Sequence, residues 1–309
     1  MTHSIIDSYR GTVKRFPGLH QRLYRIGSGY ALPVLERVAG FHTPADDPLS
    51  FRWRLVFGLH ERETVAVIRK LARRGHTALD LGAHVGYYTR LLARRVGRSG
   101  RVIAFEPHPR QFELLAGNLR GCANVQLVRK AAAASSGTAT LFDALPETAS
   151  SSLARRDDRA SWCATHVQGR ELAPRLRGDF TPRDYVVETV TIDQHLSAAG
   201  IDHVDFVKID VEGAEMAVLQ GMATTLASST PMAMVMELNP ETLGAFHCSP
   251  QSLLRDLRRH AFDLYTIEDV VKPLPLAQED QLIDGLLNQQ PGAHANLVCL
   301  RGYLPSVLE

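Results

Sequence analysis

The chain has 309 residues, of which 45% are hydrophobic and 22% are charged. This length and composition are typical of a globular protein with one domain and its additions, or at most two domains. The formal net charge of +2 is too small to indicate a polyanionic partner, although basic residues gather locally. The two basic runs are Arg69, Lys70, Arg73 and Arg74, then Arg94, Arg95, Arg98 and Arg101.

Two further features exclude other classes of protein. Residues 1–16 carry charged side chains without an apolar core, so we expect neither a secretory leader nor a membrane span there, and we expect a cytoplasmic protein. The cysteines are scattered and form no C-x-x-C pair, which argues against a zinc site, a redox dithiol or a disulfide framework. They are Cys122, Cys163, Cys248 and Cys299.

From Thr77 onward, short β-rich runs alternate with amphipathic helical patterns. The predicted strands are 77–81, 102–106, 125–128, 204–209 and 233–238, and the predicted helices between them are 85–96, 109–120 and 214–227. This alternation predicts an α/β domain with a doubly wound, mostly parallel sheet of Rossmann-like type over residues 75–309.

Two segments lie outside this repeat. Residues 1–74 are mostly helical in pattern and form an N-terminal extension, and a polar insertion rich in Ser, Arg and Asp runs from about 146 to 184. We expect the insertion to be a lid, a binding loop or a tether. Two late runs, 262–267 and 295–301, are expected to pair antiparallel, because the proline-bearing stretch between them shows no convincing crossover helix.

The strongest local signal is a glycine loop that follows the first strand and opens a helix. Gly82 and Gly86 permit a tight turn and close helix packing. A dinucleotide fingerprint would place its middle glycine where His84 stands, so the loop favours a ligand without a diphosphate. A mere strand-to-helix turn would need the same glycines.

Two carboxylates end neighbouring strands near this loop. Asp80 suits a cationic ligand group, such as the ammonium or sulfonium of S-adenosylmethionine, better than a phosphate. Glu106 ends the next strand and is the best candidate to accept hydrogen bonds from ribose hydroxyls. The alternatives are a helix-capping role for Asp80 and a solvent-exposed strand end for Glu106.

The run from Asp80 to Leu119, DLGAHVGYYTRLLARRVGRSGRVIAFEPHPRQFELLAGNL, resembles the FkbM family of class I methyltransferases. A second block, VTID at 190–193 followed by VKIDVEGAE at 207–215, is similar to that family's threonine-leucine-aspartate strand and its strand-to-helix turn. The resemblance covers about residues 73–239, and His84 stands where the family usually carries asparagine. It implies a seven-stranded methyltransferase sheet, S-adenosylmethionine as cofactor, and O-methylation of sugars, polyketides or related hydroxylated molecules.

We therefore predict an S-adenosylmethionine-dependent enzyme that methylates a hydroxyl of a sugar, glycolipid or other small metabolite. The predicted cofactor-binding residues are Asp80, Gly82, Ala83, His84, Gly86, Tyr87, Glu106, Pro107 and Asp210. The predicted partner is a small-molecule or glycan acceptor, and the sequence predicts no oligomeric state.

Acidic residues at the ends of later strands are the candidates for catalysis. Asp210 and then Glu212 could accept the alcohol proton or hold the methionine end of the cofactor, although either could instead favour the start of the following helix. Lys208 lies on the same strand face as Asp210, where it could steady an anionic acceptor or form an ordinary ion pair. Glu237 could bind acceptor hydroxyls, and its spacing argues against a metal site.

No histidine is assigned a catalytic role, and His108 is expected to be exposed near the ribose. Three alternative functions remain. An NAD-dependent oxidoreductase would use a similar loop but lacks its middle glycine here; a nucleic-acid-modifying methyltransferase has only the arginine clusters in its favour. A non-catalytic scaffold would be expected to have lost the cofactor-site residues.

Overall fold

The computed structural model describes residues 30–45, 47–143, 151–154, 184–290 and 292–308. Most of the polar insertion predicted at 146–184 lies outside the described residues, as does the first part of the N-terminal extension. The described part of that extension contains α3 (Leu32–Ala39), α4 (Leu49–Val56) and α5 (Arg62–Leu71).

The larger of two sheets contains, within the described ranges, eight strands in the order β10-β9-β11-β8-β7-β1-β2-β3. In chain order these are β1 (Thr77–Leu81), β2 (Arg101–Phe105), β3 (Val125–Val128), β7 (Phe206–Ile209), β8 (Met232–Leu238), β9 (Asp263–Ile267), β10 (Val271–Pro273) and β11 (Ala295–Arg301). Strands β3, β2, β1, β7 and β8 pair in parallel. The doubly wound, mostly parallel sheet is thus confirmed.

The prediction of seven strands is wrong by one. The eighth strand, β10, folds back on β9 as an antiparallel hairpin. The antiparallel pairing of β9 with β11 is confirmed. The stretch between them nevertheless contains a helix, α14 (Glu279–Leu287), preceded by a 3-10 turn at Leu276–Gln278. Prolines at 273 and 275 obscure its start in the sequence, and it is held by the burial of Ile283 and Leu286.

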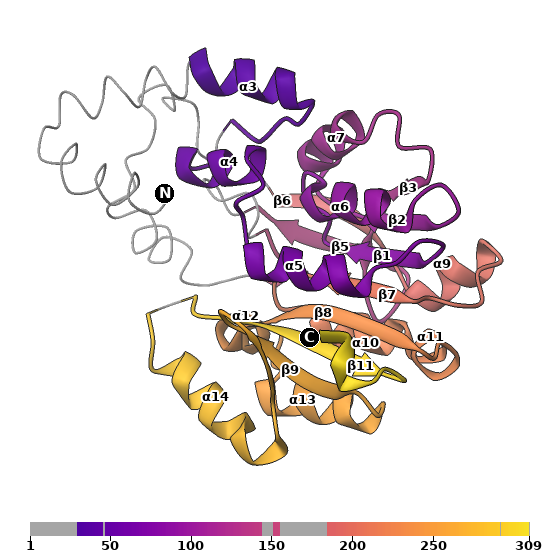
Figure 1. Ribbon diagram of the computed structural model, residues 1–309, viewed down its shortest axis with the longest axis vertical. Coiled ribbons are helices and arrows are strands. Elements are labelled where there is room, and N and C mark those ends of the chain that lie inside the picture. The colour runs from indigo at the N-terminus through magenta and orange to yellow at the C-terminus, as the bar shows by residue number, and fades with distance from the viewer. Residues whose placement is uncertain (1–29, 46, 144–150, 155–183, 291, 309) are drawn as a thin grey trace, which may run out of the picture.

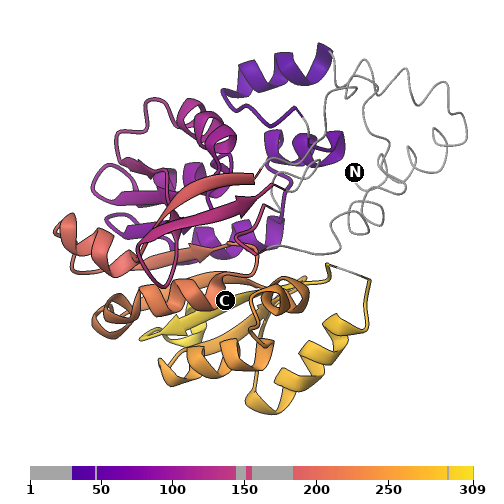
Figure 2. The same cartoon turned by 180° about the vertical axis from the view of Figure 1, so that it is seen from behind.

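Two helical layers cover the sheet, as Figures 1 and 2 show from opposite sides. One face packs against α5, α6 (Tyr87–Val96) and α7 (Pro109–Asn118). The other packs against α9 (Ile192–Ala198), α10 (Glu215–Gly221), α11 (Ala223–Ser228), α12 (Pro240–Ala245), α13 (Pro250–Arg259) and α14. A last 3-10 helix, Pro305–Leu308, packs on α5.

Strand alternation decides which side chains face which layer. On β1, Leu79 and Leu81 point into the core under α9 to α14, whereas Ala78 points toward α5 and α6. Asp80 therefore faces α6, and by the same alternation Lys208 of β7 faces the α5 and α6 layer.

A smaller sheet flanks the main one and joins β4 (Ala131–Ala132), β6 (Asp184–Val190) and β5 (Gly137–Phe142). Strand β6 is parallel to β4 and antiparallel to β5. Ser152 continues this edge through two backbone hydrogen bonds with Phe142. The segment VTID at 190–193, likened above to a strand of the family, ends β6 at Val190 and then begins a helix, because Thr191 caps α9 by accepting the amide of Gln194.

The chain order of the main sheet reverses between β1 and β7. Strands β2 and β3 lie on one side of β1, and β7 and β8 lie on the other. In open α/β sheets this reversal opens a crevice at the carboxyl ends of the strands. The candidate site is therefore sought at the ends of β1, β2, β7 and β8.

Candidate active site

Two adjoining cavities open at the carboxyl ends of these strands. The Glu106 cavity is a narrow slot of about 60 Å³ whose wall includes Glu106, Ala131, Leu141 and Leu153. The Glu61 cavity holds about 250 Å³. Its wall includes Phe51, His60, Glu61, Tyr87, Tyr88, Glu237 and His294. The cavities share Gly82, His84, Asp210 and Glu212, so they form two halves of one site.

The glycine loop forms part of the shared wall. Gly82 has a φ of +83°, and a Cβ built there would lie 1.8 Å from the carbonyl oxygen of Asp210, so only glycine fits. Gly86 begins α6 with a φ of +90°, and a Cβ there would meet Leu115 at 2.7 Å. Gly86 thus serves helix packing, while Gly82 brings β1 against the end of β7.

His84 occupies the left-handed backbone region with a φ of +50°. Histidine and asparagine are among the side chains that tolerate this conformation best, which accounts for either residue at this position. The backbone amide of His84 donates to Glu106 Oε2 at 2.7 Å. Burial, followed by the nearby His60 and His108, lowers the pKa of the His84 ring to about 3, so the ring is neutral at pH 7.

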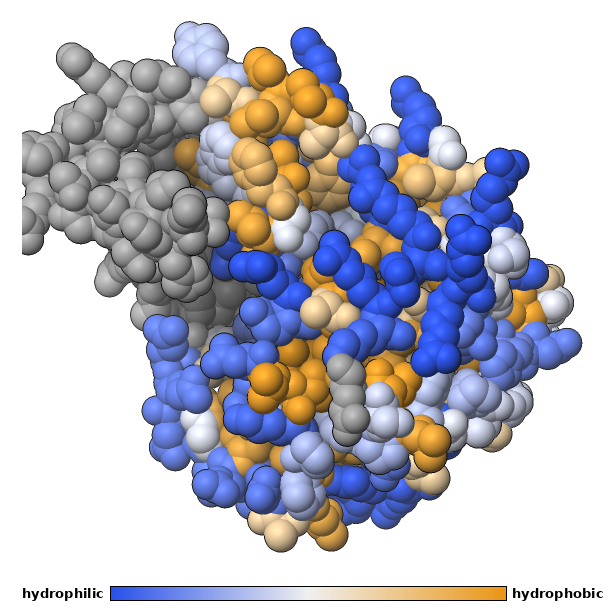
Figure 3. Space-filling view, viewed as in Figure 1, coloured by the Kyte–Doolittle hydropathy of each residue, from blue (hydrophilic) through white to orange (hydrophobic). Residues whose placement is uncertain are grey.

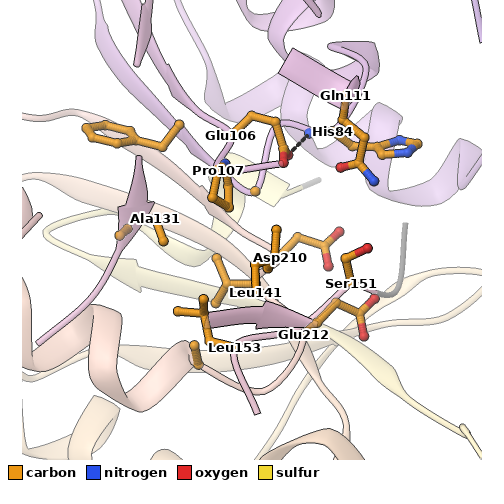
Figure 4. Close-up of a pocket in the computed structure, with 15 residues that line it drawn as sticks. His84, Glu106, Pro107, Gln111, Ala131, Leu141, Ser151, Leu153, Asp210 and Glu212 are labelled. Carbon is orange, nitrogen blue, oxygen red and sulfur yellow. Dashed lines mark hydrogen bonds between the residues drawn. The ribbon is translucent and has the colours of Figure 1, made fainter. Parts of the chain in front are cut away.

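Glu106 is held by backbone groups at the end of β2. Its Oε1 accepts the amide of His108 at 2.8 Å, and its Oε2 accepts the amide of His84. Only 4% of the residue is exposed, and burial raises its pKa to about 8 despite these two hydrogen bonds. Figure 4 shows Glu106 and Gln111 on one side of the cavity, opposite Asp210, Ser151 and Glu212. A fixed carboxylate in this position can accept two further hydrogen bonds.

Asp80 lies behind the wall of both cavities rather than on it. It is 1% exposed, and its Oδ2 accepts a hydrogen bond of 2.5 Å from the Thr89 hydroxyl of α6. Burial raises its pKa to about 6. Asp80 therefore holds α6 through Thr89 and lies behind the glycine loop.

Lys208 and Asp210 form an ion pair beneath the shared wall. The Lys208 ammonium is 2.9 Å from Asp210 Oδ2 and 5.1 Å from the ring centre of Tyr88. The lysine side chain is 1% exposed, whereas that of Asp210 is 31% exposed and lines both cavities. Burial lowers the pKa of Lys208, but the charges of Asp210 and Glu61 raise it by more, so the lysine stays charged. Asp210 does not cap a helix, because α10 begins after Ala214 without a side-chain cap.

The Glu61 cavity joins segments that are far apart in sequence. Glu61 precedes α5 with a φ of +42°, and its Oε2 accepts the Tyr88 hydroxyl at 2.8 Å and the Asn296 side-chain amide at 3.0 Å. The ring of His60 lies 3.4 Å from Glu61 Oε1. Burial raises the pKa of Glu61, but His60, Lys208 and the Tyr88 hydroxyl outweigh it, so the pKa is lowered and Glu61 is ionised.

Glu237 and His294 complete this cavity at the edge where β8 ends and β11 begins. Asn239 donates to Glu237 Oε1 at 3.1 Å, and the Nδ1 of His294 lies 3.2 Å from the Gly292 carbonyl. Burial and the charge of Asp210 raise the pKa of Glu237. Burial lowers the pKa of His294, but Glu237 and the Gly292 carbonyl raise it more. Glu237 therefore favours the protonated form of His294.

The structure brings most of the predicted site residues to the cavity walls. Those on a wall are Gly82, Ala83, His84, Tyr87, Glu106, Pro107, Asp210 and Glu212. Asp80, Gly86 and Lys208 stand behind the walls. The expectation that His108 is exposed is wrong: it is 1% exposed, because its ring packs on Tyr185 of the smaller sheet and lies 3.6 Å from the carboxylate of Asp143.

Sequence reasoning missed six polar residues of the Glu61 cavity: Asp47 and Arg54, and the four described above, His60, Glu61, Tyr88 and His294. Tyr88 lies inside the glycine-loop block, but His60, Glu61 and His294 flank α5 or β11, and no local motif marks them. Among the described residues, no group of three or more histidine, cysteine, aspartate or glutamate side chains is arranged to hold a metal. No helix in the described ranges has the length and apolar character needed to cross a membrane.

The strand order, the reversal at β1 and the antiparallel final strand define the class I methyltransferase fold. A family model described as the methyltransferase FkbM domain matches residues 80–264. The protein belongs to this family of methyltransferases.

Individual relatives match shorter stretches. The chain is 43% identical over 74 residues to a 2-phytyl-1,4-naphtoquinone methyltransferase of Thermosynechococcus vestitus, covering 24% of this chain and 30% of that protein. It is 27% identical over 157 residues to methyltransferase sdnD of Sordaria araneosa, and this match covers 47% of this chain and 59% of that protein. The chain thus spans less than two thirds of the length of these relatives. Among solved structures, Aeropyrum pernix fibrillarin with bound S-adenosyl-L-methionine matches with a TM-score of 0.39 and 14% identity over 77% of this chain and 74% of that one.

Proposed function

We propose that the protein transfers a methyl group from S-adenosylmethionine to a hydroxyl of a small, polar acceptor such as a sugar or glycolipid. The observation that carries this proposal is the meeting of two unlike cavities at one wall. The Glu106 cavity offers a fixed carboxylate beside an apolar slot, and the Glu61 cavity offers several carboxylates, histidines and aromatic rings. Gly82 and Asp210 stand between them.

The residues of the Glu106 cavity fit the nucleoside half of the cofactor. Glu106 keeps acceptor capacity for the two ribose hydroxyls because each of its oxygens accepts one backbone amide and an ionised carboxylate oxygen can accept more. Ala131, Leu141 and Leu153 form apolar walls suited to the adenine ring. When bound, S-adenosylmethionine supplies a methyl group on a cationic sulfur. Asp210 and Glu212 bring negative charge to the shared wall, where they would stabilise its cationic end.

The Glu61 cavity fits a hydroxylated acceptor. Carboxylates and imidazoles bind hydroxyl groups, and the rings of Tyr87, Tyr88 and Phe51 offer apolar faces for the carbon skeleton. Asp210 lines both cavities and pairs with the Lys208 ammonium at 2.9 Å, so it is our proposed acceptor of the alcohol proton. Positioning the hydroxyl at this wall would provide most of the acceleration, since alignment alone can supply roughly 7–11 kcal/mol.

Calorimetric titration tests the cofactor assignment. We expect S-adenosylmethionine to bind and NAD not to bind. At about pH 9, where Glu106 is ionised, we expect Glu106→Gln to weaken S-adenosylmethionine binding about ten-fold because the diol loses a charged acceptor. Glu188→Gln is the matched control, because Glu188 is an exposed residue of β6 in a surface pair with Lys130. Binding of NAD alone, or an equal loss in both variants, would refute the assignment.

The acceptor is tested with the same protein. Transfer of a labelled methyl group should be detected on a member of a panel of sugars, glycolipids and polyols, and it should be lost in Asp210→Asn. Transfer confined to amines, carbon acids or nucleic acid would overturn the hydroxyl proposal while leaving the methyltransferase assignment intact.

A further inference from the structure

One face of the molecule carries a pronounced excess of positive charge. Residues 62–101 contain ten lysines and arginines but only two acidic residues, Glu63 and the buried Asp80, whereas the whole chain has a net charge of +2. Helices α5 and α6, which carry most of these side chains, pack against each other. Figure 3 shows their hydrophilic side chains gathered on the viewed face, with apolar surface beside them over α3.

A groove of about 230 Å³ lies where the basic and apolar surfaces meet. We name it the Arg94 groove. Its floor is apolar and includes Phe41, Leu55, Val56, Val65 and Leu91. Its polar side chains include Arg69 of α5 and Arg90 and Arg94 of α6. The last two are spaced four residues apart, so they project from the same face of α6.

The three arginines differ in how they are held. Arg90 donates to the carbonyls of Ala39 at 3.0 Å and Gly40 at 3.2 Å, which fastens α6 to the end of α3. Arg69 and Arg94 are exposed and have no ion pair with any acidic residue in the part of the chain that the structure describes. Two guanidinium groups beside an apolar groove are thus available to a ligand.

The Arg94 groove adjoins the Glu61 cavity. Leu55 and Tyr87 line both, so the two spaces share part of their walls. Two exposed apolar residues are sequence neighbours of residues that line the groove: Val38 precedes Ala39, and Phe57 follows Val56. A ligand in the groove would therefore combine apolar contact along its length with an anionic group at the arginines.

We propose that the Arg94 groove binds a lipid-like molecule with a phosphate-bearing headgroup and directs it toward the Glu61 cavity. Arginine pairs well with phosphate because its planar guanidinium donates two parallel hydrogen bonds. A free phosphate would leave the apolar floor unused. A nucleic acid would require rings for stacking, but of the two aromatic residues that line the groove, Phe41 is buried beneath Arg90 and the Tyr87 hydroxyl donates to the His60 carbonyl. The exposed ring of Phe57 beside the groove is already stacked on Trp53.

The binding itself does not depend on the proposed function, but the inference that the bound lipid is a methyl acceptor rests on it. A phospholipid or phosphorylated glycolipid in the groove would place its polar end near Tyr87 and the Glu61 cavity. This chemistry narrows the acceptor class from any hydroxylated molecule to an amphiphile that carries both a hydroxyl and a phosphate.

Calorimetry with a soluble short-chain lipid tests the groove. Dihexanoylphosphatidylglycerol, used below its micelle concentration, should bind the wild-type chain, and the double variant R69Q/R94Q should weaken it about ten-fold or more. R255Q/R259Q is the matched control: it removes two exposed arginines from α13, on the opposite layer, with the same change in net charge. Thermal unfolding should show both variants folded.

Each probe has an outcome that decides the proposal. An equal loss in the two double variants, or no binding of the lipid to the wild-type chain, would overturn it. Glycerol 3-phosphate binding as tightly as the lipid would show a plain anion site, and a single-stranded oligonucleotide binding more tightly would show a nucleic-acid surface. S-adenosylmethionine is titrated separately and should bind R69Q/R94Q normally, so failure of the proposed function is distinguishable from failure of the groove.

Discussion

The two halves of the site are built in different ways. The Glu106 cavity is fixed by backbone: two amides hold Glu106, and Gly82 packs directly against the Asp210 carbonyl. The Glu61 cavity is fixed largely by side chains from distant segments, such as the bonds from Tyr88 and Asn296 to Glu61. A wall held by backbone tolerates little variation, whereas a wall of side chains can change its specificity without disturbing the fold.

The electrostatics of the halves differ as well. In the Glu106 cavity, burial favours neutral forms of His84 and Glu106. In the Glu61 cavity, Glu61 is ionised, the charge of Glu237 raises the pKa of His294, and burial and the charge of Asp210 raise the pKa of Glu237 although His294 lowers it. The first half is thus suited to shape and fixed hydrogen bonds, and the second to recognition of polar groups and proton transfer.

The largest effect is expected where the two halves touch. Gly82→Ala places a Cβ 1.8 Å from the Asp210 carbonyl and forces a left-handed backbone on alanine, so β1 and β7 must separate. We expect a loss of stability of about 3 kcal/mol or more, measured by urea unfolding, together with loss of S-adenosylmethionine binding. Gly117→Ala is the control: nothing lies within 4 Å of a Cβ there, and this position in α7 should gain about 0.5–1 kcal/mol. A Gly82→Ala protein as stable as wild type would contradict the close packing of this wall.

A somewhat smaller effect is expected at the ion pair beneath the wall. Asp210→Asn leaves the buried Lys208 ammonium without its nearest carboxylate, and we expect a cost of about 2–3 kcal/mol, below the full value for a buried pair because the Asp210 side chain is partly exposed.

The double variant K208M/D210N separates stability from catalysis. Removing both charges should restore most of the stability in thermal unfolding, since no buried charge is left unpaired. Methyl transfer should remain lost if Asp210 accepts the proton. Recovery of both stability and transfer in the double variant would show that the pair is only structural.

The difference between a cavity held by local backbone and a cavity built from distant segments also explains what could be predicted from the sequence. The strand alternation, the glycine loop and Glu106 are encoded locally, because each depends on residues within one strand and the turn after it. The eighth strand and α14 were missed since a three-residue edge strand and a helix after two prolines give weak patterns.

The Glu61 cavity could not be predicted in this way. Glu61 and Asn296 meet only because β11 runs antiparallel to β8 and returns its first residues to the carboxyl edge of the sheet. The burial of His108 likewise depends on the smaller sheet, which places Tyr185 and Asp143 over its ring. Such placements follow from topology rather than from any motif.

The smallest expected effect is a pH dependence confined to the Glu106 cavity. Burial raises the pKa of Glu106 to about 8, so its carboxyl group is protonated at lower pH and ionised above. The ionised form accepts hydrogen bonds from both ribose hydroxyls, and the affinity for methylthioadenosine should therefore rise a few-fold between about pH 6.5 and about pH 9. This probe is chosen because it lacks the amino acid end of the cofactor and its titration. In Glu106→Gln the affinity should be weak and flat across the same range.

Without ligand, the raised pKa of Glu106 has the opposite consequence for stability. The folded state binds the proton more tightly than the unfolded state. The stability of the wild type relative to Glu106→Gln should therefore fall as the pH rises from the ordinary pKa of 4.5 through the raised pKa of about 8. Affinity that falls with pH in the wild type, or rises equally in the variant, would show that Glu106 does not bind the ribose.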